Sequence, residues 1–201
     1  MDTTFFLIGA GGHAKVIIEI IEEMGGRIAG LSDDNKAINS LHDYPVNENA
    51  PQDAQIILAI GNNAGRKRLA EEMNNSFGTA IHPKATLSGR CSVGEGTVIM
   101  AGATINSSTT IGKHCIINTN ASVDHDCVIK DFAHISPNAA LAGNVTVGEG
   151  AQVGIGSAVM QGICVGDWAI VGAGAVVIED VPDYAVVVGV PARVIRYTKD
   201  Q

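Results

Sequence analysis

Large aliphatic residues recur every six positions from Ile81 to Val177, and a second register four residues after each is occupied mostly by small residues. An amphipathic helix needs apolar spacing near 3.6 residues, and a half-buried strand needs strict alternation. A sustained period of six fits neither, and it predicts a parallel β-helix built from hexapeptides. One large and one small side chain of each hexapeptide should point inward, and three hexapeptides should close one coil. The array predicts between five and six coils, without a long loop.

The stretch before the repeats has a different pattern. Apolar runs at Thr4–Ile8, Arg27–Leu31 and Gln55–Ile60 predict three short buried strands. Amphipathic spacing predicts helices at roughly 15–24 and 64–74. Alternating strands and helices are typical of a small parallel α/β unit of Rossmann-like type.

The remaining segments set the expected boundaries. Residues 36–54 are polar and are expected to form a connection with one helical turn. We predict an α/β domain over 1–79 and a β-helix domain with a C-terminal tail over 80–201. An exposed β-helix end is an open sheet edge. We therefore expect the α/β domain to cover one end and the tail to cover the other.

Composition narrows the class of protein. The net charge of −8 argues against nucleic acid and anionic membranes as partners. Met1–Thr4 carries no positive charge, unlike a signal peptide, and no apolar stretch reaches membrane-spanning length. Cys91, Cys115 and Cys127 lie in the small inward register, which indicates packed thiols in a reduced, cytoplasmic protein. Without a CxxC pair, we expect no metal site.

A glycine motif, Gly9-x-Gly11-x-x-Ala14, lies between the first strand and the first helix. Glycines let the backbone approach phosphates, and a helix N-terminus offers free N–H groups. Asp33 follows the second strand, where dinucleotide folds place a ribose-binding carboxylate. The unit is too small for a full dinucleotide domain, so a mononucleotide or nucleotide sugar fits better. The alternative is a tight turn that merely needs glycine.

Two histidines of the repeat region are expected to face outward. His125, followed by Asp126, occupies a corner where the solenoid gives it no core role. An imidazole titrates near neutrality and can accept a proton, and an adjacent carboxylate would raise its basicity. The alternative is a solvated corner histidine. His134 falls near another corner. One side of the coil, with a rise of ~3.3 Å per residue, separates the two histidines. The two could act together only across an interface between two prisms, which predicts an oligomer.

The whole chain resembles the bacterial sugar acetyltransferases of the sialic acid O-acetyltransferase group. The features shared with that group are Gly9-Ala10-Gly11-Gly12-His13-Ala14-Lys15, Ser32-Asp33-Asp34, Ile60-Gly61-Asn62-Asn63, the hexapeptide array, His125-Asp126 and Gly189-Val190-Pro191-Ala192-Arg193. It is most similar to the acetyl-CoA-dependent N-acetyltransferases of UDP-4-amino-sugars, as in bacillosamine synthesis. This resemblance implies a left-handed coil and a homotrimer with active sites between adjacent β-helices.

The resemblance also implies roles for individual residues. His125 matches the general base and Asp126 the acidic residue beside it, where the family commonly has Glu. The remaining matches are Gly11, Gly12 and His13 near the sugar and phosphates, Asp33 and Asp34 near the uridine, Gly61 lining the pocket, and His134, Gly143 and Ala173 as acetyl-CoA contacts. The implied reaction acetylates the 4-amino group of a UDP-2-acetamido-4-amino-2,4,6-trideoxy-glucose.

Other functions remain open on sequence grounds. The same scaffold and base could serve an O-acetyltransferase acting on sialic acid or another sugar hydroxyl. A GDP- or dTDP-linked amino sugar could replace the UDP-linked one. A non-enzymatic, nucleotide-binding β-helix would differ by failing to bind acetyl-CoA. A dinucleotide-dependent oxidoreductase rests on the glycine loop alone.

Overall fold

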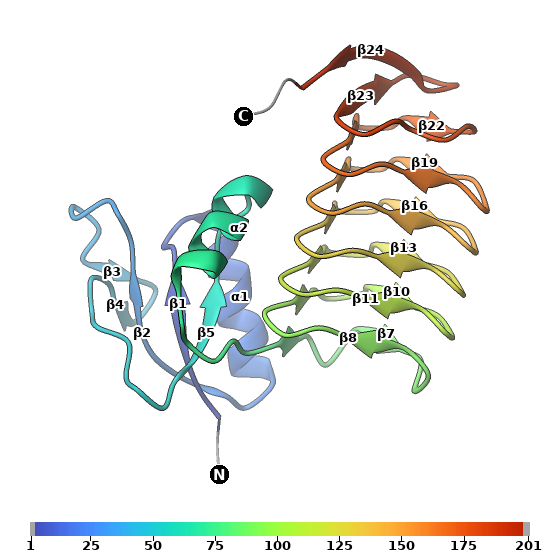
Figure 1. The fold of residues 1–201 in the computed structure, drawn as a ribbon. Helices are drawn as coiled ribbons and strands as arrows, with labels where there is room; N and C mark the ends of the chain where they lie inside the picture. The colour runs from blue at the N-terminus through green and yellow to red at the C-terminus, as the bar shows by residue number, and fades with distance from the viewer. Residues whose placement is uncertain (1–2, 199–201) are drawn as a thin grey trace.

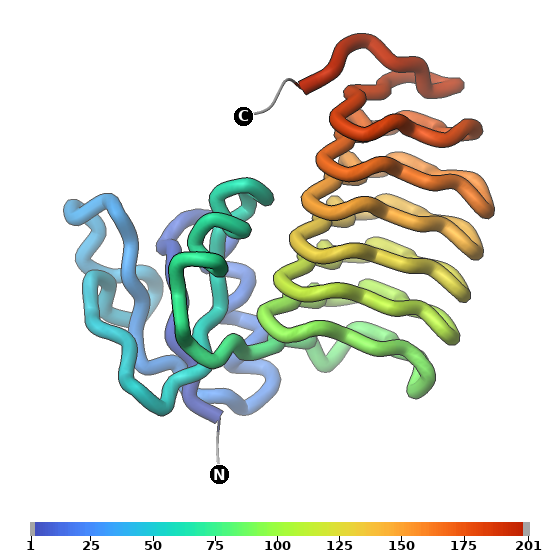
Figure 2. The backbone as a smooth tube through the Cα atoms, in the orientation of Figure 1, coloured from blue at the N-terminus to red at the C-terminus, as the bar shows by residue number. Residues whose placement is uncertain are grey.

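The predicted solenoid is the larger part of the structure, a computed structural model that describes residues 3–198. Seventeen two-residue strands wind upward in a regular stack (Figures 1 and 2). They are β6 Ala80–Ile81, β7 Thr86–Leu87, β8 Ser92–Val93, β9 Val98–Ile99, β10 Thr104–Ile105, β11 Thr110–Ile111, β12 Ile116–Ile117, β13 Ser122–Val123, β14 Val128–Ile129, β15 His134–Ile135, β16 Ala140–Leu141, β17 Thr146–Val147, β18 Gln152–Val153, β19 Ala158–Val159, β20 Cys164–Val165, β21 Ile170–Val171 and β22 Val176–Val177.

The strands form three parallel sheets, one for each side of the coil. One sheet contains β6, β9, β12, β15, β18 and β21, and we call it the docking face. The second runs from β7 to β22, and the third from β8 to β20. Partners lie eighteen residues apart, as in Ile105 opposite Val123. The hexapeptide prediction is confirmed, because both inward registers, including Cys115 and Cys127, form one buried core.

The corners between the sheets require left-handed backbone. Residues with positive φ recur every six positions, from Gly96 to Gly174. Glycine adopts this conformation freely and asparagine tolerates it, whereas bulkier residues are rare there. Phe132 and Trp168 nevertheless occupy such corners, with φ of 61° and 57°. Asp126, with φ 58°, is also a corner residue, so the coil geometry fixes its direction.

The N-terminal unit is a three-stranded parallel sheet with two helices. Its elements are β1 Thr4–Ile8, α1 Gly12–Glu23, β2 Arg27–Ser32, β3 Ser40–Leu41, β4 Tyr44–Pro45, β5 Gln55–Leu58 and α2 Asn63–Glu72. The sheet order is β2-β1-β5, and Gly25 with φ 74° follows α1 as predicted. The segment 36–54 holds the small hairpin β3–β4, so the predicted helical turn there is wrong. Antiparallel pairing of Leu41 with Tyr44 satisfies the backbone instead.

The α/β unit lies beside the solenoid rather than over its end (Figure 1). The outward positions of the first three strands of the docking face are Ala80, Val98 and Ile116, and all three are buried in one cluster with α1. The expectation that this unit covers one end of the solenoid is therefore wrong. Covering the apolar side chains on the outside of three stacked coils removes more apolar surface from water than covering the end of the solenoid would.

The C-terminal tail does cover the last coil. β23 (Ala185–Val188) pairs with β21, and β24 (Arg193–Tyr197) returns antiparallel to β23. Ala185 and Val187 join the solenoid core. The tail thereby satisfies the sheet edge that the final coil would otherwise leave open. No helix among residues 3–198 combines the length and apolar character needed to cross a membrane.

Candidate active site

Three loops at one edge of the N-terminal sheet carry most of the predicted nucleotide contacts. Because β1, β2 and β5 are parallel, the segments that follow their carboxyl ends meet at the same edge. A side-chain carbon added at Gly11, Gly12 or Gly61 would meet no atom within 4 Å, so these loops border open space. α1 begins at Gly12 rather than near Lys15, which places His13 in its first turn.

Asp33 connects two of these loops. One carboxylate oxygen accepts a hydrogen bond from the Ala10 N–H at 2.7 Å, and the other accepts one from the Asn35 N–H at 2.8 Å. Its carboxylate therefore fixes the shape of the glycine loop. The neighbouring Asp34 is exposed at the same edge. Of the two predicted uridine contacts, Asp34 has the side chain that is more available to a ligand.

His13 and His134 lie close together where the α/β unit meets the solenoid, and both are largely buried. Burial, followed by the nearby Arg66 charge, lowers the pKa of His13 to about 4. The same causes and the neighbouring His13 lower the pKa of His134 to about 3. His134 Nε2 lies 3.0 Å from the Asn118 amide nitrogen, whereas His13 Nε2 has no hydrogen-bond partner among the described residues.

The low pKa values of this pair give a testable dependence of stability on pH. The unfolded chain binds protons on both rings below about pH 6.5, whereas the folded chain does so only near 4 and 3. Their contribution to stability is therefore complete above the unfolded pKa and is lost progressively as the pH falls from the unfolded pKa through the folded values. We expect the melting temperature to decline between pH 6.5 and 4.5, where most carboxylates stay ionised.

Thermal unfolding across this range would check the expectation. His134→Gln cannot take up the proton and should flatten part of the decline. An equally steep decline in that variant would contradict the assignment to His134.

The structure also identifies Arg66 and Asn118, which the sequence reasoning missed, and it gives a buried side-chain contact to Asn63 of the Ile60–Asn63 motif. Arg66 and Asn63 belong to the first turn of α2, and both are buried where that helix meets the solenoid. Arg66 is 1% exposed. A buried arginine is rare without a partner, but its burial could not be deduced before the docking face was known.

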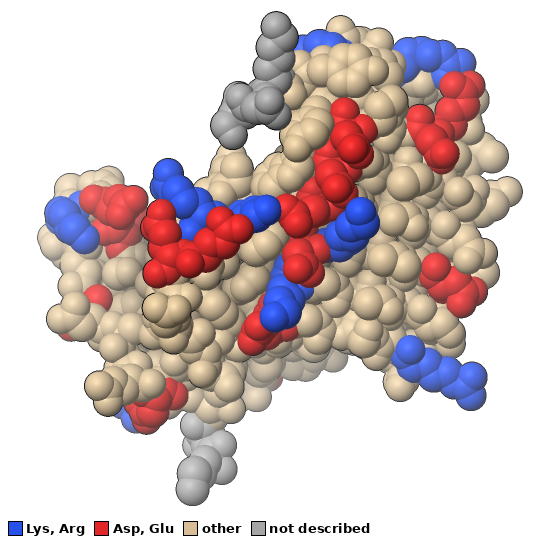
Figure 3. All heavy atoms as spheres, in the orientation of Figure 1, with Lys and Arg blue, Asp and Glu red and all other residues tan. Residues whose placement is uncertain are grey.

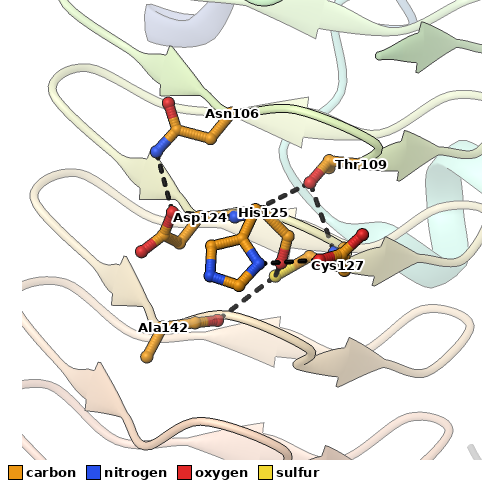
Figure 4. A network of polar contacts seen from close by, with 7 residues as sticks. Asn106, Thr109, Asp124, His125, Cys127 and Ala142 are labelled. Atoms are coloured by element: carbon orange, nitrogen blue, oxygen red, sulfur yellow. Dashed lines mark hydrogen bonds and ion pairs between the residues drawn. The ribbon is translucent and has the colours of Figure 1, made fainter. Parts of the chain in front are cut away.

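His125 projects from the corner between the second and third sheets, after β13 (Figure 4). Its Nδ1 lies 2.7 Å from an Asp126 carboxylate oxygen, and its side chain is 55% exposed. The Asp126 hydrogen bond and then the Asp124 charge raise its pKa. Asp124 also accepts a hydrogen bond from the Asn106 amide at 2.8 Å. With Nδ1–H donated to the carboxylate, Nε2 keeps the lone pair that accepts a proton.

Gly143 lies one coil further along the same corner, directly under the His125 ring. A side-chain carbon at Gly143 would lie only 2.6 Å from His125 Cε1 and 2.7 Å from Nε2. Real carbon contacts are not this short, so the His125 ring occupies the space that a side chain at position 143 would need. Asp126 holds one edge of the imidazole while Gly143 supports its face, and together they fix its direction.

Gly143→Ala should therefore lower kcat by displacing the His125 ring from Asp126. A shift on the order of 1 Å in a reacting group can cost ~10²-fold. Alanine keeps the backbone N–H, so a main-chain contact with acetyl-CoA would survive and the KM for acetyl-CoA should change little. Steady-state kinetics would separate the two constants.

Gly89 is the matched control, because it occupies the equivalent corner and an added side-chain carbon meets nothing within 4 Å. Gly89→Ala should leave kcat unchanged. Equal kcat values for the two variants would show that the space at Gly143 does not constrain the ring.

The structure does not bring His125 and His134 together within one chain. His134 begins β15 on the docking face, whereas His125 occupies the corner formed by the other two sheets. Ala173 is exposed after β21, at a third position. Among the described residues, no group of three or more His, Cys, Asp or Glu side chains is placed to hold a metal ion.

Comparisons with known proteins agree with this architecture. Residues 4–73 match the PglD N-terminal domain. A curated relative, UDP-N-acetylbacillosamine N-acetyltransferase from Bacillus subtilis, is 43% identical over 108 residues, which cover 44% of this chain and 47% of the relative. That match therefore spans less than half of the relative's length.

Solved structures match over the full length. A histidine-to-asparagine variant of perosamine N-acetyltransferase from Caulobacter crescentus, in complex with CoA and GDP-perosamine, is 38% identical with a TM-score of 0.91, covering 100% of this chain and 98% of that one. The acetyltransferase domain of PglB from Neisseria gonorrhoeae, in complex with acetyl coenzyme A, is 35% identical with a TM-score of 0.90, covering 97% and 100%. With this identity along both chains, the protein belongs to the family of nucleotide-sugar N-acetyltransferases that join a PglD-type N-terminal domain to a left-handed β-helix.

Proposed function

We propose that this protein transfers the acetyl group of acetyl-CoA to the 4-amino group of a UDP-linked amino-dideoxy sugar of the UDP-2-acetamido-4-amino-2,4,6-trideoxy-glucose type. The observation that carries the proposal is the exposed His125–Asp126 pair, with Nδ1 2.7 Å from the carboxylate. An exposed imidazole oriented by a carboxylate is suited to general-base catalysis. The bacillosamine enzyme of Bacillus subtilis supports the choice of sugar.

In the proposed reaction the neutral sugar amine attacks the thioester carbonyl carbon. His125 Nε2 accepts a proton from the nitrogen as the N–C bond forms. The resulting oxyanion needs a backbone N–H donor, a role that the Gly143 corner suits. Collapse then breaks the C–S bond, and CoA thiolate leaves. No acyl-enzyme is required, and Cys115 and Cys127 are buried in the solenoid.

We assign the nucleotide sugar to the loops of the α/β unit, through Gly11, Gly12, His13, Asp34 and Gly61. Asp33 shapes that pocket through its bonds to the two loops. Acetyl-CoA is assigned to the solenoid, with His134, Gly143 and Ala173 as contacts. The four cysteines are free thiols, which fits a reducing, cytoplasmic setting.

Both substrates can meet His125 only if a second subunit supplies part of the site. In one chain the α/β unit covers the first three strands of the docking face, while His125 projects from the opposite corner. Val128 and Met160, close to that corner along the coils, are 42% and 43% exposed. A neighbouring solenoid would cover these apolar side chains. We therefore propose a homotrimer with three sites, each between adjacent β-helices.

A GDP-linked amino sugar is the second candidate. The perosamine N-acetyltransferase that binds GDP-perosamine matches this chain over its whole length, whereas the bacillosamine match covers 44% of it. Exposed Asp34 could accept hydrogen bonds from either base, because uracil and guanine both carry N–H donors.

Product mass would test the proposal. The protein would be incubated with acetyl-CoA and a panel of UDP-, GDP- and dTDP-linked 4-amino sugars, with free and CMP-linked sialic acid as the hydroxyl acceptors. We expect one acetyl group to be added to the UDP-linked amine. Acetylation of a sialic acid hydroxyl, with the amines unchanged, would replace the proposal with O-acetyl transfer. Absence of acetyl-CoA binding by calorimetry would reject both.

A further inference from the structure

The Arg66 guanidinium bonds in two directions from the first turn of α2. Toward the solenoid, Nε donates to the His114 carbonyl and Nη2 to the Phe132 carbonyl, each at 2.8 Å. Toward its own domain, Nη1 donates to the Ile60 carbonyl at 2.9 Å and approaches the Gly61 carbonyl at 3.5 Å. A single buried side chain thereby connects the loop after β5 to two successive coils.

Asn63 extends this contact to a third coil. Its side-chain oxygen accepts from Arg66 Nη2 at 2.9 Å, and its nitrogen donates to the Gly150 carbonyl at 3.0 Å. His114, Phe132 and Gly150 are eighteen residues apart and have φ of 53°, 61° and 62°. They are therefore equivalent corner residues of three consecutive coils. The two α2 side chains bind a vertical row of corner carbonyls, which fixes the position of the α/β unit along the solenoid.

The buried charge of Arg66 makes this contact sensitive to substitution. Among residues 3–198 all the acceptors of Arg66 are neutral oxygens, so its charge has no carboxylate partner there. Burial of this kind is costly unless the donors are satisfied. Burial lowers the pKa of Arg66 to about 10, which still leaves it charged at neutral pH. Lysine has a single ammonium group in place of the planar fork and cannot reach both directions at once.

We propose that Arg66 is a positioning residue that holds the Gly61 loop and His13 in register with His134 on the solenoid. This inference rests on the proposed function, in which the loop binds the nucleotide sugar and the solenoid binds acetyl-CoA. Ion pairs along the same edge do not explain the register. Lys67–Glu149 joins α2 to the solenoid, whereas Lys113–Glu95 and Lys130–Asp167 lie within the solenoid. Charged side chains form a row on this face of the molecule (Figure 3), and exposed or half-exposed pairs contribute little.

Arg66→Lys tests the proposal, with Arg68→Lys as the matched control. Arg68 lies on the same helix, is 71% exposed and pairs only with Glu72 at 3.9 Å among the described residues. We expect Arg66→Lys to raise the KM for the nucleotide sugar turned over by the unaltered protein by roughly tenfold or more, since misplacement of about 1 Å can cost ~10²-fold. The dissociation constant for acetyl-CoA, measured by calorimetry, should stay within a factor of about two.

Hydrogen exchange supplies a readout that does not depend on turnover. Amides of the loop 60–63 and of the corner at 114 and 132 should exchange faster in Arg66→Lys than in Arg68→Lys. Unchanged exchange and unchanged KM would overturn the proposal. A parallel loss of acetyl-CoA affinity and melting temperature would also overturn it, because Arg66 would then serve the fold alone. If no nucleotide sugar is acetylated, the proposed function fails, while the exchange comparison still decides the role of Arg66.

Discussion

His125→Ala is expected to lower the rate of acetyl transfer by about 10²- to 10⁴-fold, the usual contribution of a positioned general base. A trace of activity should remain, because both substrates are still bound side by side. The side chain is 55% exposed at a solenoid corner, so its removal should not disturb the fold. Acetyl-CoA binding by calorimetry should be unchanged.

Gln161→Ala provides the control for this substitution. Gln161 is exposed at the equivalent corner two coils further on, and its loss should leave the rate unchanged. Asp126→Ala should reduce the rate less than His125→Ala does, since the imidazole itself remains. Full activity in His125→Ala would end the assignment of the base.

The pH dependence of the rate follows from the same pair. Asp126 and then Asp124 raise the pKa of His125, and only the neutral imidazole accepts a proton. The rate should therefore be complete above this raised pKa and should fall as the pH drops through it. Asp126→Asn removes the main cause, so the acid limb of kcat should move to lower pH.

The solenoid could be predicted in detail because every hexapeptide meets the same local packing requirement. Each hexapeptide must fill the same core, so the same apolar spacing recurs along the whole array, and the structure places both inward registers in that core. The outward direction of His125 follows from the same count. Its contact with Gly143 also follows from the eighteen-residue coil, but only the structure shows how close the ring lies.

The docking of the α/β unit could not be predicted from local patterns. The docking depends on which outward positions of the solenoid are covered by a segment distant in sequence. From the sequence alone, Arg66 is expected to be an ordinary surface residue of its helix, because nothing local predicts that α2 packs against the solenoid. A signal was nevertheless present. The outward register of the docking face runs Ala80, Val98, Ile116 and then His134, and three successive apolar residues facing out indicate a covered surface.

This outward register also places His134 next to the docked α/β unit. The α/β unit covers the apolar positions Ala80, Val98 and Ile116, and His134 is the next position along the same face. On this register the apolar cover therefore ends at the first polar residue. The low pKa values of His13 and His134 follow from this junction, because it buries them beside the Arg66 charge.

Co-assembly of two inactive variants should restore activity if the sites lie between subunits. The first variant, His125→Ala, keeps its nucleotide loops. The second, Gly11→Trp, keeps its base and blocks the glycine loop with a large side chain. Gly11 suits this purpose, because its φ of −88° accepts any residue and, apart from its chain neighbours, no atom of the described residues lies within 4 Å of an added side-chain carbon.

Each variant alone should retain only a trace of activity, whereas the co-expressed mixture should recover about a quarter of the normal rate. In the proposed cyclic trimer every site would combine a base from one subunit with a nucleotide loop from its neighbour. Random assembly gives both intact parts to roughly one site in four. Trimers carrying one tag of each kind would also be purified and assayed against the separate variants. Each of these mixed trimers has one fully intact site in three, so about a third of the normal rate is expected from them. Recovery that stays at the level of either variant would place each complete site within one chain, because mixing could then never join an intact base to an intact loop.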